Sequence, residues 1–334
     1  MATYLAYHFH FQSPLHLGRS GIGLEVTAVS VPADTLFSAI CQAWSTFYGV
    51  ESLQAFLGEY MQESAELPFA LTSGFPFAGE VRFYPKPGRN IGCADKDRKK
   101  VKQIQFVSAK RFQQMVDNES IEFSADELVN GGTVWIHSDE RPQLQACLGP
   151  AQNIWETDVR PRVTIDRQTS SSEIWHQGYV KFNQGCGLWF GARFRDDTVQ
   201  AKIETLLRVL GDTGIGGERT TGCGFFSMES KPLAVPEART EADQFVTLAP
   251  ICPRDPNELQ HLTQGKVNYT LEQRAGWTSS LEVRDRRRKR IWLFADGSVL
   301  NWKHGTIGRL VDLTPDSFPH PIYRYGYGWP VQLR

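Results

Sequence analysis

The sequence lacks the marks of several protein classes. No two of its six cysteines form a CxxC pair, which argues against a zinc knuckle and a dense disulfide scaffold. No run of about 18 apolar residues occurs, so no membrane-spanning helix is expected. Lys plus Arg number 36 against 37 for Asp plus Glu, and this net charge of -1 gives no global attraction to a polyanion. Any nucleic-acid site must therefore be local.

Signals for targeting and disorder are equally scarce. The N-terminal stretch MATYLAYHFHF has neither a basic region nor an unbroken apolar run, so it does not read as a secretory signal. Hydrophobic residues make up 41% of the 334 residues and aromatic residues 12%, a composition too apolar for a disordered chain. We expect a folded, cytoplasmic protein of about two domains.

Strand and helix patterns are mixed along the chain without a tandem repeat. Residues 4–11 place apolar side chains at every second position, which predicts an opening strand. Helical spacing predicts one helix from an Asp34 cap to a stop at Gly49, and another from an Asp197 cap to Gly211. This mixture is typical of an α+β fold. Shorter helices are predicted at 53–60 and 110–116, and strands at 245–249, 267–272 and 291–294.

Composition also suggests how the chain is divided. The polar segment 229–243 contains two prolines and reads as a linker, so we place a domain boundary at 235/236, giving domains 1–235 and 236–334. Residues 82–111 are rich in Lys and Arg and read as an exposed basic loop. The segments 158–167 and 179–194 read as strands, with residues 168–178 as a projecting hairpin between them.

A glycine-rich loop carries the clearest functional signal. Residues 211–226 read GDTGIGGERTTGCGFF and follow a predicted helix and precede a predicted strand. A P-loop needs GxxxxGK[ST] between a strand and a helix, and a dinucleotide fingerprint also needs a following helix, so neither fits. Consecutive N–H groups of such a loop can still line a concavity for a phosphodiester backbone. A polynucleotide is the better candidate ligand.

Several segments together resemble a known family. GIGGERTTGCGFF looks like the glycine-rich signature of the RAMP superfamily of CRISPR proteins. PADTLFSAICQAW at 32–44, VTIDRQT at 163–169 and YRYGYGWPV at 323–331 resemble segments of subunit four of the type III-A (Csm) interference complex. Ala33 stands where that family usually has Ser, so an RNA contact through this hydroxyl would have to come from Ser30 or Thr35 instead.

The resemblance implies a fold and a function. It implies two ferredoxin-like (RRM-like) RAMP domains with antiparallel sheets and a glycine-rich loop. It also implies a non-catalytic subunit that binds the repeat-derived 5′ handle of the guide RNA and caps the backbone of the complex. The implied protein partners are the large polymerase-like subunit and the first backbone subunit. No cofactor or metal, no membrane and no homo-oligomer is expected.

The candidate RNA-binding residues come from four segments. Arg219 follows the glycine turn and has the planar guanidinium that suits bidentate phosphate contact, although a salt bridge to Glu218 or Asp212 is the alternative. Arg160 and Arg162 are spaced to share one strand face. The full set is His16, Arg19, Ser38, Arg160, Arg162, Arg167, Gly214, Ile215, Gly216, Gly217, Arg219, Thr220 and Thr221.

Other features leave alternatives open. The cationic run 284–290 reads equally well as a phosphate grip, an acidic-partner contact or a solvated hairpin tip. The alternation of Tyr323, Tyr325, Tyr327 and Trp329 favours a strand with one buried face over base stacking. Asp166 is interpreted as a residue that orients an arginine.

Two rival functions remain at this point. Some RAMP relatives cut precursor guide RNA, and His8, His10 and His16 are the candidate acid and base groups for such an endoribonuclease. No second base or lysine is fixed beside them by spacing, and no metal-hydrolase motif is present, so catalysis is the weaker hypothesis. A pure protein-interaction module would explain the aromatic content and the neutral charge, but not the glycine-rich loop.

Overall fold

The structure is a computed structural model that describes most of the chain. The described residues are 3–18, 23, 25–62, 66–89, 91–234, 243–276, 287–302 and 305–334. Arg19, the predicted boundary at 235/236 and residues 284–286 of the cationic run lie outside these ranges. Within them the fold is α+β, and every pair of named strands is antiparallel except one in an inserted subdomain.

The central sheet is built on the predicted opening strand. β1 (Thr3–Phe11) lies between β11 (Phe226–Pro232) and β10 (Cys186–Phe194), and β10 also pairs with β3 (Phe75–Ala78) and with β2 (Phe69–Leu71). The predicted alternation is present, because successive side chains of a strand point to opposite faces. Tyr7 stacks on Phe190 and Phe9 on Phe226, both in the core. The other face presents His8 and His10, each edge-on to Phe77.

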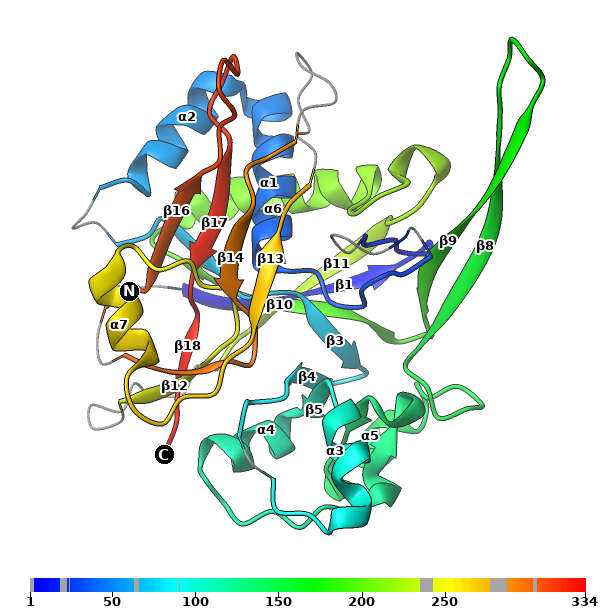
Figure 1. The fold of residues 1–334 in the computed structure, drawn as a ribbon, viewed down its shortest axis with the longest axis vertical. Helices are drawn as coiled ribbons and strands as arrows, with labels where there is room; N and C mark the ends of the chain where they lie inside the picture. Colours follow the sequence, from blue (N-terminus) through cyan, green and yellow to red (C-terminus); the bar gives the residue numbers. More distant parts are fainter. Residues whose placement is uncertain are drawn as a thin grey trace.

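Three helices pack with this sheet (Figure 1). α1 (Ala33–Tyr48) ends at Gly49 as predicted, and α2 (Val50–Glu59) follows directly. α6 (Asp197–Thr213) presents the predicted apolar stripe to the core, which includes Ile203, Leu206 and Leu210. Contacts of α1 with α2 and α6 complete this layer.

Two predicted caps were wrong by one or two residues. The N-cap of α6 is Asp196, whose carboxylate accepts the Val199 N–H at 2.9 Å, and the helix continues to Thr213. The N-cap of α1 is Pro32, whereas Asp34 lies in the first turn. Asp34 is buried and forms an ion pair with Arg324, a partner 290 positions away that local sequence does not reveal.

An inserted subdomain occupies residues 79–154. It extends the central sheet beyond β3 and lies at the bottom of Figure 1. The predicted short helix is present, and the basic segment around residues 96–102 is partly helical and mostly exposed. Its elements are β4 (Val81–Pro85), α3 (Arg98–Gln103), β5 (Phe106–Ser108), α4 (Ala109–Val116), β6 (Leu128–Val129), β7 (Val134–Trp135) and α5 (Arg141–Leu144). β5 and β7 are the parallel pair.

A long hairpin projects from the molecule (Figure 1). Its strands are β8 (Trp155–Ile165) and β9 (Ser172–Phe182), and they pair along their full length from Trp155–Phe182 to Ile165–Ser172. The sequence predicted the projection but placed it at residues 168–178. The hairpin is longer because the regular pairing continues to both sides of a short turn at residues 166–171.

The part of the chain from residue 243 to residue 334, called the C-terminal half below, packs on the residues before it, the first half, through a shared core. Tyr325 lies against Phe37 of α1 at 4.9 Å between ring centroids, and one apolar cluster contains residues of both halves. The predicted burial of Tyr325, Tyr327 and Trp329 is confirmed. The elements are β12 (Gln244–Thr247), α7 (Pro256–Thr263), β13 (Leu271–Arg274), β14 (Ile291–Phe294), β15 (Val299–Asn301), β16 (Gly308–Asp312), β17 (Tyr323–Tyr327) and β18 (Pro330–Gln332).

Within the described ranges, no helix is both long enough and apolar enough to cross a membrane.

Candidate nucleic-acid interface

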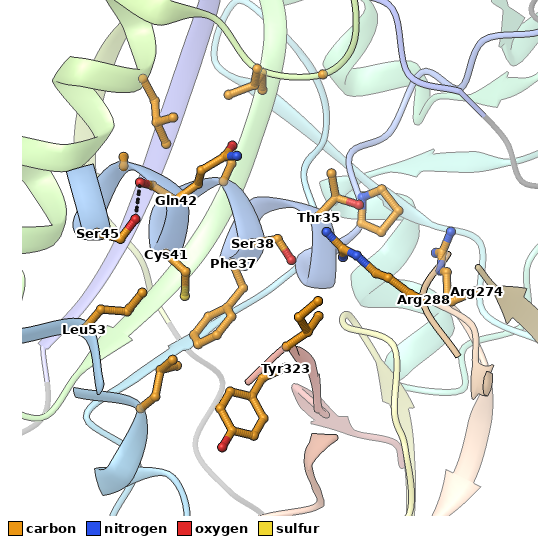
Figure 2. A pocket seen from close by; sticks show the side chains of 18 of the residues that line it. Thr35, Phe37, Ser38, Cys41, Gln42, Ser45, Leu53, Arg274, Arg288 and Tyr323 are labelled. Carbon is orange, nitrogen blue, oxygen red and sulfur yellow. Dashed lines mark hydrogen bonds between the residues drawn. The ribbon is translucent and has the colours of Figure 1, made fainter. Parts of the chain in front are cut away.

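A large groove runs along α1 between the two halves of the chain. Its volume is about 1390 Å³. One side consists of α1, α2, the C-terminal end of α6 and the glycine-rich loop, and the other consists of β13, Arg288, Trp292 and residues 320–323. Figure 2 shows Thr35, Ser38 and Ser45 of α1 on one side, with Arg274, Arg288 and Tyr323 opposite. A groove of this size holds several groups of an extended ligand.

The glycine-rich loop is held closely against the chain that follows β1. Gly216 has φ +86°, and a Cβ atom there would lie 2.4 Å from the His16 carbonyl oxygen. Gly224 has φ +80°, and its Cβ atom would lie 2.0 Å from the Ile215 carbonyl oxygen. The Gly217 N–H donates to the His16 carbonyl at 2.9 Å. Both glycines are therefore required by positive φ and by close backbone approach, and the loop has one defined conformation.

The candidate residues of this loop divide into an anchor and a surface. Ile215 is 2% exposed and fixes the loop to the core. Gly214 to Gly217 and Arg219 line the groove. Arg219 and Thr220 are exposed, and within the described residues Arg219 forms no ion pair with Glu218 or Asp212. The loop thus offers an uncompensated guanidinium at the edge of the groove.

His16 lies beneath this loop and does not line the groove. Its ring is 5% exposed, and Nδ1 is 2.7 Å from the Gly178 carbonyl oxygen of β9. The ring also meets Tyr179 edge-on at 6.2 Å between centroids. The sequence grouped His16 with the RNA-contacting residues, but in the structure its buried ring joins the loop to the base of the hairpin.

The hairpin arginines meet the glycine-rich loop at the hairpin base. Arg162 donates to the Tyr179 hydroxyl at 2.8 Å and to the Thr221 hydroxyl at 3.3 Å, and lies 3.8 Å from Glu218. Arg160 lies over the same Tyr179 ring, with its guanidinium carbon 5.3 Å from the centroid. The predicted common face of Arg160 and Arg162 is confirmed, and Tyr179 is the residue that sequence reasoning missed.

The hairpin tip is built differently from the prediction. Asp166 accepts the backbone N–H groups of Gln168 at 2.7 Å and Thr169 at 3.3 Å, so it closes the turn and does not orient an arginine. These bonds hold the pKa of Asp166 below its usual value. Arg167 is exposed in this turn, at the far end of the hairpin from the glycine-rich loop.

Ser38 lies on the groove wall, in the second turn of α1. It is the sixth residue of α1, and its hydroxyl donates to the Asp34 carbonyl at 2.8 Å. At the start of α1, the Ala33 N–H is bound to the Ser73 hydroxyl at 2.9 Å. In this arrangement the Ser38 hydroxyl proton is bound by the helix backbone, and its side chain lines the groove.

Two of the three histidines of the rival nuclease hypothesis, His8 and His16, are buried. His8 is 4% exposed and accepts a hydrogen bond from Arg82 Nε at 3.1 Å. Burial, together with the nearby charge of Arg82, lowers the pKa of His8 to about 3, so it is neutral at physiological pH. His10 lies 3.9 Å from Glu229, and His16 is bound to Gly178. In the part of the chain that the structure describes, no three His, Cys, Asp or Glu residues are placed to hold a metal ion.

Comparisons with known proteins agree with the resemblance in the sequence. Residues 153–227 match a family model described as "RAMP superfamily", and residues 240–333 match one described as "CRISPR Csm4 C-terminal domain". The first match contains the hairpin and the glycine-rich loop, and the second contains β13, β14 and β17.

Whole-chain relatives lead to the same group. "CRISPR system Cms protein Csm4" of Thermococcus onnurineus is 26% identical over 311 residues, which cover 90% of each chain. A chain in the "Csm3-Csm4 subcomplex in the type III-A CRISPR-Cas interference complex" superposes with a TM-score of 0.70 at 17% identity, covering 99% of both chains. One in the "Csm1-Csm4 cassette in complex with cA4" gives 0.61 at 16% identity, covering 99% of this chain and 98% of that one. The chain therefore carries a RAMP superfamily region followed by a Csm4 C-terminal domain, and the family resemblance predicted from the sequence is confirmed.

Proposed function

We propose that this chain is the subunit of a type III-A CRISPR effector complex that binds the repeat-derived 5′ handle of the guide RNA. In this role it caps the backbone of a cytoplasmic ribonucleoprotein and does no chemistry of its own. The observation that carries the proposal is the groove edge formed by Gly214 to Gly217 and Arg219, where a strand can approach glycine backbone beside an exposed guanidinium that forms no ion pair with a described residue. The N–H groups of Gly214, Ile215 and Gly217 donate to carbonyl groups of the chain itself, so the contact depends on Arg219 and on the shape of the loop. Such a surface binds phosphates by shape and charge, while guide pairing reads the target sequence.

Strand order supports the two-domain interpretation of the fold. The order β11-β1-β10-β3, with α1 after β1 and α6 before β11, is that of a ferredoxin-like βαββαβ unit. In the C-terminal half the strand order is β18-β12-β15. The isolated Asn268–Val299 bridge then connects β15 to the segment that contains β13. At the point in the chain where a ferredoxin-like unit has its second helix, this chain has the β16–β17 hairpin. We therefore keep 1–235 and 236–334 as the two domains.

The protein partners follow from the relatives. Structures of Csm4 chains with Csm3 and with Csm1 have the same fold as this chain. We propose that the homologous backbone and large polymerase-like subunits assemble with this chain. The projecting β8–β9 hairpin supports this role, since Val163, Ile165 and Ile174 on its arms are each more than half exposed and need a partner surface.

The test replaces Arg219 in the assembled complex. Arg219→Ala should weaken retention of the guide roughly tenfold, since one charge-assisted phosphate contact is lost. Arg219→Lys should retain part of the binding because charge remains without the planar fork. The measurement is guide RNA bound per complex across a salt series. Gly216→Val is unsuitable, because its Cβ atom would meet the His16 carbonyl and disturb the fold.

Lys202 provides a matched control for Arg219. It is a cation on α6, over the Trp44 ring and outside the loop, so Lys202→Ala should leave guide retention unchanged. A wild-type complex without guide RNA, or equal guide retention by Arg219→Ala and the wild type, would contradict the proposal. Cleavage of precursor repeat RNA by the purified wild-type chain would favour a processing nuclease instead.

A further inference from the structure

A second cationic cluster lies across the groove from the glycine-rich loop. Arg274 at the end of β13 and Arg288 before β14 both line the groove near the start of α1, as Figure 2 shows. Behind them Arg324 of β17 is 5% exposed and is paired with the buried Asp34. Arg274 Nε lies 3.8 Å from Asp34 Oδ1. Three guanidinium groups thus surround one carboxylate.

The charges of this cluster do not balance. Glu272 neutralises Arg274 at 2.8 Å, and Asp34 neutralises Arg324. Arg288 forms no ion pair with any described residue, and its Nε atom is buried without an acceptor. Burial and the charge of Arg324 lower the pKa of Arg288, and Asp34 only partly opposes them. A desolvated cation of this kind is strongly stabilised by an anion that enters the groove.

The neighbouring carboxyl group, that of Asp296, does not fully neutralise Arg288. Asp296 also lines the groove, but its Oδ1 atom accepts the Ser73 hydroxyl at 3.0 Å, and Ser73 in turn receives the Ala33 N–H. Burial raises the pKa of Asp296 to about 7, so near neutral pH it is only partly ionised. Near neutral pH Asp296 therefore offsets the charge of Arg288 only in part, and the cluster keeps a net positive charge.

We propose that Arg288, assisted by Arg274, binds one backbone phosphate of the RNA strand that the glycine-rich loop holds on the opposite side of the groove. The inference rests on the proposed function and adds a second, separate phosphate position supplied by the C-terminal half. RNA is favoured over an acidic protein segment because both cationic edges border one continuous groove, and a phosphodiester chain presents an anion at every nucleotide. The bound strand would then link the two halves.

The experiment uses the complex reassembled from purified subunits with synthetic guide RNA. Arg288→Gln removes the charge at similar side-chain length, and Lys289→Gln is the matched control, because Lys289 is exposed and lies 3.8 Å from Asp316. Arg288→Gln should weaken guide binding about 5- to 20-fold at 0.15 M salt and lower the salt slope by about 0.7. Lys289→Gln should match the wild type, and Arg288→Lys should recover part of the affinity.

Neutral phosphate analogues then locate the contact. In a series of guides, each with one methylphosphonate at a different handle position, the substitution should weaken binding to the wild-type complex at two positions. Arg288→Gln should become insensitive at one of them and Arg219→Ala at the other. A thermal melt of each complex separates loss of contact from loss of fold.

The outcomes distinguish this inference from the proposed function. If the wild-type complex holds no guide, the proposed function fails. If Arg219→Ala loses the guide while Arg288→Gln behaves like Lys289→Gln, only the second phosphate position is wrong. If Arg288→Gln keeps the guide but releases the large subunit, the anion is a protein carboxylate and the inference is overturned.

Discussion

The two edges of the groove are built from different kinds of structure. The glycine-rich edge is made by the backbone: Gly216 and Gly224 lie against neighbouring carbonyl groups, and the charged side chain that lines the groove there, Arg219, is exposed. The opposite edge is made by side chains, with Arg274 and Arg288 packed around the buried Asp34–Arg324 pair. The conformation of the glycine-rich edge depends on positions that only glycine can occupy. The conformation of the opposite edge depends on the burial of its side chains and on the balance of their charges. The two edges should therefore respond to different substitutions.

The largest expected effect comes from breaking the backbone edge. Gly224→Val places a Cβ atom 2.0 Å from the Ile215 carbonyl oxygen at φ +80°, and should cost on the order of 4 kcal/mol or more of unfolding free energy. Gly222→Ala is the control, because φ is +89° but no atom lies within 4 Å, and it should cost only about 1 kcal/mol. Denaturant unfolding measures both. Equal losses would show that close approach does not decide the conformation.

The next effect comes from breaking the side-chain edge. Asp34→Asn leaves Arg324 buried without its counter-charge and should cost about 3 kcal/mol of unfolding free energy. Arg219 lies outside this network, so Arg219→Ala should leave the same quantity nearly unchanged. Urea unfolding of both variants at one ionic strength makes the comparison. A stable Asp34→Asn variant would mean that solvent or another carboxylate serves Arg324.

A pH series sharpens the comparison further. The pKa of Asp296 is raised by burial to about 7, whereas an unfolded Asp titrates near its usual value, so the contribution of Asp296 to stability should fall as pH rises from about 4 to about 7. The groups that face it are Ser73, Arg274, Glu272 and Asp34. Asp296→Asn stays neutral and should be more stable than the wild type by about 1 to 3 kcal/mol at pH 8, with almost no difference below pH 4.

The smallest effect is expected where the hairpin meets the backbone edge. Tyr179→Phe removes the hydroxyl that accepts from Arg162 but keeps the ring under Arg160. Tm should change by about 2 °C or less, because Arg162 still reaches Thr221 and water. Guide retention should fall slightly as the arginine loses its orientation. A large drop in Tm would indicate that this hydroxyl, and not apolar packing, holds the hairpin base.

Sequence reasoning succeeded for features that depend on residues close together in the sequence. Strand β1 and helices α1, α2, α4 and α6 each depend on spacing or on turn residues that lie next to one another in the chain. The shared face of Arg160 and Arg162 follows from strand alternation alone.

Sequence reasoning failed where the position of a residue depends on a partner that is distant in the sequence. Asp34 was assigned as a cap because its partner Arg324 is not visible locally, and the burial of His16 was not predicted because its bond to Gly178 spans 162 positions. Arg274 carried no signal at all, since an isolated arginine beside a short strand reads as a surface residue. Charge balance around Arg288 becomes visible only when three distant segments are assembled.

The last residues of the chain complete the core of the first half. The Tyr325 hydroxyl accepts the Leu71 N–H at 3.3 Å, and the Tyr327 hydroxyl donates to the Tyr60 carbonyl at 2.8 Å. During synthesis on a ribosome, β1, α1 and β2 therefore emerge long before the strand that seals them. The apolar surface that Tyr325 and Tyr327 cover in the folded protein therefore stays uncovered until β17 has been synthesised, which delays completion of this core.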